Sequence, residues 1–95
     1  MSDTANALDL GPELTIVHAN QIRDTLLTHV SLGHEEVLLD LSGAVEVDSS
    51  AVQILMSLQQ SLNAQGRNLR IAGMSKNLRD VLTLYAVQPL LDAQH

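Results

Sequence analysis

The apolar residues of this 95-residue sequence recur at helical spacing in three stretches, with short apolar runs between them. In the first stretch, Ala19, Ile22, Leu26 and Val30 share one face of a predicted helix, and Gly33 is expected to end it. That helix should therefore bury one face and expose the other.

Two short strands are predicted before that helix. Residues 7–10 and 13–17 alternate apolar and polar positions, the pattern of strands with one buried face. Residues 1–6 are mostly polar and are predicted to form a flexible arm, because exposed chain ends are seldom held in place. The folded domain is then a single unit comprising residues 7–95.

The middle of the chain predicts a βαβ unit. A strand at 37–41, a helix at 51–62 and a strand at 69–72 follow one another, and such crossovers make the two strands parallel. A third helix is expected to start at Ser75, and Pro89 to end it or the turn after it. The predicted buried stripes are Ala51, Leu55, Leu58 and Leu62 for the second helix, and Leu78, Val81, Leu82 and Tyr85 for the third.

Composition narrows the range of functions. The chain has a formal net charge of −6, five scattered basic residues and a single aromatic residue, so it lacks the basic patch and the stacking side chains of a nucleic-acid binder. No cysteine is present, and no apolar run is long enough to cross a membrane. We therefore expect a cytoplasmic protein without direct membrane insertion.

Candidate catalytic and cofactor chemistry is sparse. Asp40, Glu46 and Asp48 lie near predicted strand ends, but no nucleophile or base accompanies them, so no catalytic residue is assigned. No glycine-rich phosphate loop is present, which leaves no predicted cofactor site. The histidines have no metal-ligand spacing and are interpreted as surface residues rather than metal ligands; they are His18, His29, His34 and His95.

The turn Asp48-Ser49-Ser50 joins an extended segment to the second helix. Ser50, with Gln53 three residues later, fits a capping box, which is a complete structural explanation of the turn. The functional interpretation is that a serine hydroxyl here accepts a phosphoryl group. A helix N-terminus stabilises added negative charge, although Asp48 would repel it.

Three segments of the sequence resemble the STAS domain of bacterial anti-sigma factor antagonists. They are Val37-Leu38-Leu39-Asp40-Leu41-Ser42, Val47-Asp48-Ser49-Ser50 and Gly66-Arg67-Asn68-Leu69-Arg70-Ile71, and the resemblance extends over about residues 8–91. It implies an α/β fold with a small four- to five-stranded mixed sheet and helices mainly on one side.

The resemblance also implies a mechanism. In antagonist members a partner anti-sigma factor that is a serine kinase phosphorylates the serine after the aspartate, here Ser49, and a phosphatase restores it. Asp48 and Ser50 would neighbour the phosphosite, and Ala51, Val52, Met56 and Gln59 would contact the partner. For Val52, Met56 and Gln59, a plain position at the edge of the core is equally consistent with the pattern.

One difference from the family pattern supports an alternative function. Many antagonists have Gly-Leu-Gly after the serines, whereas this chain has Ala51-Val52-Gln53, which leaves the helix start less open to a kinase. The alternative is a constitutive adaptor that binds chemotaxis components or an ABC transporter for phospholipids. A small-molecule or lipid-binding domain is a third reading, and it requires an apolar cavity.

Overall fold

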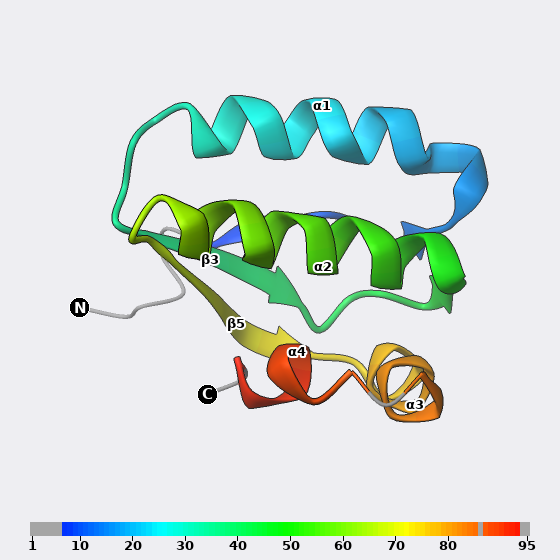
Figure 1. Cartoon of the computed structure of the whole chain (residues 1–95). Helices are drawn as coiled ribbons and strands as arrows, with labels where there is room; N and C mark the ends of the chain where they lie inside the picture. Colours follow the sequence, from blue (N-terminus) through cyan, green and yellow to red (C-terminus); the bar gives the residue numbers. More distant parts are fainter. Residues whose placement is uncertain (1–6, 86, 94–95) are drawn as a thin grey trace.

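Three parallel strands form the centre of the structure, a computed structural model that describes residues 7–85 and 87–93 (Figure 1). Strand β3 (Glu36–Leu41) lies between β1 (Leu8–Asp9) and β5 (Asn68–Met74). Both faces of β3 are buried in its apolar run, as expected for a central strand. The predicted βαβ unit with parallel outer strands is confirmed.

A second, two-stranded sheet extends the first. Strand β2 (Glu13–Leu14) continues from β1 and pairs with β4 (Glu46–Val47), which continues from β3. Among the described residues all strand pairs are parallel, so five strands form two parallel sheets rather than one mixed sheet. Gly11, which adopts a φ of 83°, lies in the turn between β1 and β2, and these two strands pair with β3 and β4 rather than with each other as a hairpin.

Helices α1 (Ala19–Val30) and α2 (Ser49–Ala64) lie side by side (Figure 1). The limits predicted for α1 are confirmed, but the strand predicted at 13–17 is only β2 followed by the 3-10 helix η2 (Ile16–His18). Ile16, which the alternation placed on the same side as the buried Leu14, is 70% exposed there, so the alternation that suggested a longer strand does not reflect burial.

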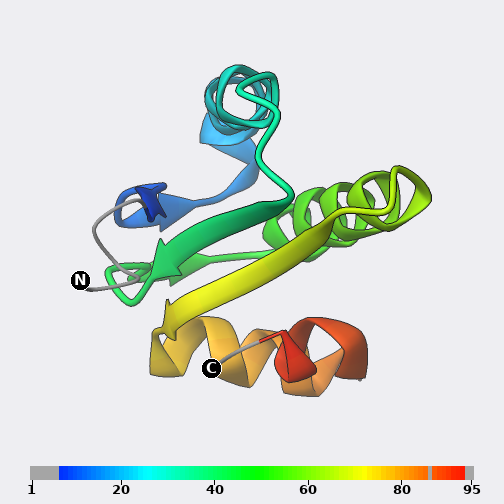
Figure 2. The same ribbon diagram turned by 90° about the vertical axis from the view of Figure 1, so that its left-hand side faces the viewer.

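Helices α3 (Lys76–Leu84) and α4 (Gln88–Asp92) lie beside β5, away from α1 (Figure 2). The Ser75 side chain caps α3, accepting a hydrogen bond from the Leu78 amide. After α4, the Ala93 carbonyl accepts a hydrogen bond from the Ile71 amide of β5. The chain after α4 therefore covers part of the outer edge of β5. Pro89 does not end α3, which stops at Leu84; it lies in the first turn of α4, directly after the turn that follows α3.

A single aliphatic core joins these elements, in agreement with the lack of Phe and Trp. At the edge of this core, the Arg67 guanidinium donates hydrogen bonds to the carbonyls of Val30 (3.1 Å) and His34 (2.8 Å). These bonds attach the end of α1 to the start of β5. No helix among the described residues is long and apolar enough to cross a membrane. The arm predicted at residues 1–6 lies outside the described residues.

Candidate functional site

Helix α2 begins at Ser49, and its N-terminal cap is Asp48. One carboxylate oxygen of Asp48 accepts a hydrogen bond from the Ser50 amide at 2.9 Å and a further one from the Ser50 hydroxyl. The prediction that Ser50 itself caps the helix is therefore wrong by two positions. Ser50 lies inside the first turn, where its hydroxyl donates to the cap.

The second carboxylate oxygen of Asp48 reaches another part of the chain. It accepts a hydrogen bond from the Ile16 amide at 3.0 Å, which attaches the start of α2 to η2 (Ile16–His18). The bond from the Ser50 hydroxyl, followed by that from the Ile16 amide, lowers the pKa of Asp48 below its ordinary value of 3.8. Asp48 is thus a charged acceptor that positions the turn.

Ser49 is the first residue of α2, and its side chain is exposed. Among residues 7–85 and 87–93, nothing forms a hydrogen bond with its hydroxyl. The two serines therefore differ: Ser50 is engaged with the cap, whereas Ser49 is free to react without breaking it. Ser49 is the residue that the family resemblance names as the phosphoacceptor, and its phosphorylation stays a prediction.

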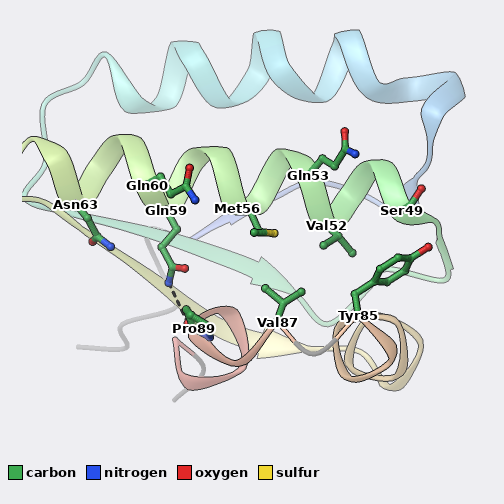
Figure 3. A pocket seen from close by; sticks show the side chains of 10 residues that line it. All are labelled: Ser49, Val52, Gln53, Met56, Gln59, Gln60, Asn63, Tyr85, Val87 and Pro89. Atoms are coloured by element: carbon green, nitrogen blue, oxygen red, sulfur yellow. Dashed lines mark hydrogen bonds between the residues drawn. The ribbon is translucent and has the colours of Figure 1, made fainter.

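A groove of about 510 Å³ begins at Ser49 and follows α2 toward its C-terminal end (Figure 3). We call it the α2–α4 groove. Ser49 and Tyr85 lie at one end of it and Asn63 at the other, and Gln59 donates a hydrogen bond across it to the Pro89 carbonyl at 3.0 Å. All the residues that line it are uncharged: Ser49, Val52, Gln53, Met56, Gln59, Gln60, Asn63, Tyr85, Val87 and Pro89.

Three of the four residues predicted to contact a partner line this groove. Met56 and Gln59 do so with accessible side chains, and Val52 lines it although it is only 4% exposed. Ala51, 3% exposed, is absent from the lining. Tyr85 was predicted to be buried, but it is 53% exposed at the end of α3 and lines the groove. Val87 and Pro89 form the wall of the groove opposite α2, and the sequence patterns did not predict it. The signal in the sequence was the apolar segment that follows α3.

Two other candidate side chains from the sequence, Asp40 and His18, have local partners. Asp40 accepts hydrogen bonds from the hydroxyl and the amide of Ser42, which lower its pKa, and it serves the turn after β3. His18 lies 2.6 Å from a carboxylate oxygen of Glu13. Within the part of the chain that the structure describes, no three acidic or histidine side chains gather in a metal-binding cluster. The arrangement is suited to binding and to modification of an exposed hydroxyl.

Acid should weaken the Asp48 contacts. Because the pKa of Asp48 is lower in the folded chain than its ordinary value, its contribution to stability is complete above about pH 3.8 and is lost as the pH falls through the folded-state pKa. We expect the free energy of unfolding, measured in urea, to decline below about pH 3.8. Asp48→Asn should show a shallower decline, and an identical slope in both proteins would contradict this assignment.

The comparison with family models agrees with this picture of a small α/β binding domain. The model described as "Mlab, STAS domain" matches residues 1–92, so the chain belongs to the STAS domain family. Members of this family broadly have regulatory or protein-interaction roles and are generally not enzymes. No curated protein and no solved structure matched the chain.

Proposed function

We propose that this protein is a cytoplasmic, non-enzymatic regulatory domain that binds a protein partner through the α2–α4 groove and is switched by phosphorylation of Ser49. The observation that carries the proposal is the position of Ser49, whose exposed hydroxyl lies at the end of an uncharged groove while the helix cap uses other atoms. The partner is an anti-sigma factor serine kinase, and a phosphatase reverses the modification.

Electrostatics explains how such a switch works. A phosphoryl group adds a charge of about −2 to a groove whose lining residues carry none. Burying that charge against an apolar partner surface is costly, so the complex dissociates. The domain itself stays folded, because the N-terminus of α2 tolerates an anion and the Asp48 cap is untouched.

The test is purification of the tagged chain from its native host, with mass spectrometry of the chain and of the proteins bound to it. We expect a fraction of the wild-type protein to carry one phosphoryl group on Ser49, and Ser49→Ala to lack it and retain the partner. Ser49→Asp should reduce recovery of the partner about tenfold, a change of about 1.4 kcal/mol in binding free energy.

Ser31→Asp is the control for added charge, because Ser31 is exposed at the C-terminal cap of α1 and does not line the groove. It should bind the partner like wild type. Circular dichroism checks that the domain folds without the hydrogen bond from the Ser31 hydroxyl to the Thr28 carbonyl. Absence of phosphate under all growth conditions, together with normal binding by Ser49→Asp, would rule out the switch.

One observation favours a second candidate, the constitutive adaptor in a chemotaxis or phospholipid-transport complex. Ala51 is packed in the core, so the first turn of α2 is a regular closed helix without the glycines found in many antagonists. A kinase would have to recognise Ser49 on that rigid turn. The adaptor predicts equal partner binding by wild type, Ser49→Ala and Ser49→Asp.

A further inference from the structure

Two side-chain hydroxyls at the same end of the α2–α4 groove form no hydrogen bond with any residue in the ranges 7–85 and 87–93. One belongs to Ser49 at the start of α2, and the other to Tyr85 at the C-terminal cap of α3. Figure 3 shows the Tyr85 hydroxyl directed toward the N-terminal end of α2, where Ser49 lies. Because Tyr85 is 53% exposed, its ring can turn without disturbing the core.

The other hydrogen-bond donors around the start of α2 are already in use. A phosphoryl group on Ser49 would bring strong acceptor oxygens that need donors. The Ser50 amide donates to the Asp48 carboxylate, and the Ala51 amide donates to the Asp48 carbonyl at 3.1 Å. Among the described residues, no lysine, arginine or histidine lines the groove. The neutral side chains of the groove are therefore the donors that this chain can offer.

Two glutamines of α2 are less suited to this role than the tyrosine. Gln59 already donates to the Pro89 carbonyl at 3.0 Å. Gln53 lies one helical turn after Ser49, but Figure 3 shows its amide directed toward α1 and away from Tyr85. Holding a long glutamine side chain in one conformation also costs more entropy than holding a tyrosine ring. Tyr85 is thus the donor that geometry and entropy both favour.

We propose that Tyr85 holds the phosphoryl group on Ser49, with its phenolic hydroxyl donating a hydrogen bond to a phosphoryl oxygen. The inference rests on the proposed function, because it takes Ser49 as the modified residue. A hydrogen bond to a charged acceptor is stronger than one between neutral groups, so the ring and the phosphoryl group stay together at the end of the groove.

This contact gives phosphorylation a second effect on the partner. In the unmodified chain the Tyr85 ring is available to the partner, and tyrosine is enriched among the residues that contribute most to binding energy at interfaces. Once its hydroxyl binds the phosphoryl group, the ring is withdrawn from the partner. Phosphorylation of Ser49 then adds charge to the groove and also removes the only aromatic contact that the groove provides.

The test is phosphorus-31 NMR of the full chain with phosphoserine at position 49, installed by amber suppression so that no kinase is needed. The phosphoryl group is titrated with pH in the wild-type background and in Tyr85→Phe, which removes the hydroxyl and keeps the ring. A donor hydroxyl favours the dianion, so the pKa of the second phosphoryl ionisation should be higher in Tyr85→Phe by about half a unit, the effect of one modest hydrogen bond.

Phosphoserine at position 57 is the matched control. Ser57 is an exposed serine of the same helix, and it is absent from the lining of the α2–α4 groove, so Tyr85→Phe should leave its titration unchanged. Tyrosine fluorescence gives a second measurement, because Tyr85 is the only aromatic residue of the chain. Phosphoserine at position 49 should change this emission, whereas phosphoserine at position 57 should not. Circular dichroism checks that each protein folds.

Equal titrations of the position-49 phosphoryl group with and without the Tyr85 hydroxyl, or an unchanged emission, would overturn the proposal. A shift caused by Gln53→Ala and not by Tyr85→Phe would also overturn it, because the glutamine would then be the donor. Neither result bears on the proposed switch, since the phosphoryl group is installed and no partner is present. Conversely, a lack of phosphate on Ser49 in the native host would remove the switch and leave this hydrogen bond measurable.

Discussion

Leu55→Ala is expected to lower the free energy of unfolding by about 2–5 kcal/mol, the largest loss that we predict for a single substitution in this chain. Leu55 is 1% exposed on the buried face of α2 and belongs to the aliphatic core. Truncation removes apolar contacts and leaves a cavity. The core has no Phe or Trp whose ring could shift to fill that space.

Chemical denaturation monitored by far-ultraviolet circular dichroism measures this effect. Leu84→Ala is the matched control, because the same truncation is made at a leucine that is 80% exposed on α3, and its cost should stay below about 0.5 kcal/mol. Similar losses in both variants would mean that α2 does not anchor the fold. A large loss confined to Leu55→Ala would show that the core holds α2, and with it the α2–α4 groove, in place.

The parts of the fold that sequence patterns predicted well are those with long, regular periodicity. The face formed by Ala19, Ile22 and Leu26 predicted α1 because each of these side chains is buried. The apolar run of β3 and the crossover through α2 predicted a parallel pair for the same reason. Local burial patterns and the final structure agree in these elements.

Contacts between distant segments were not predictable in the same way. The pairing of β2 with β4 joins Glu13 to Glu46, and nothing in the short alternating stretches specifies that partner. Likewise, Asp48 and Ser50 are both good capping residues, so local chemistry leaves the choice between them open. The hydrogen bond from the Ile16 amide favours Asp48 in that position, and it depends on the tertiary fold.

The groove, too, was predicted on the side formed by α2 and not on the side formed by later segments. The family resemblance, placed on the Asp-Ser-Ser turn and on α2, named Ser49, Val52, Met56 and Gln59, and they line one groove. The opposite wall was not foreseen, because helical periodicity placed Tyr85 in the core. Helix α3 ends at Leu84, so Tyr85 no longer follows that periodicity and faces the groove.

Asp48→Ala is expected to cost about 2 kcal/mol of stability, because it removes an N-cap and leaves the Ile16 amide without its acceptor. Asp48→Asn is the informative companion. Its side-chain oxygen can still accept from the Ser50 amide, but its nitrogen cannot accept from Ile16, so it should lose only part of that stability.

Hydrogen exchange of the Ile16 amide separates the two roles of Asp48. Both variants should speed exchange at Ile16, whereas only Asp48→Ala should also speed exchange at Ser50, the first amide of α2 bonded to the cap. If Ile16 remained protected in Asp48→Asn, the link between η2 and α2 would not depend on the carboxylate. The predicted pattern would instead establish that Asp48 fixes the position of the first turn of α2 relative to η2. That position leaves Ser49 exposed at the edge of the groove.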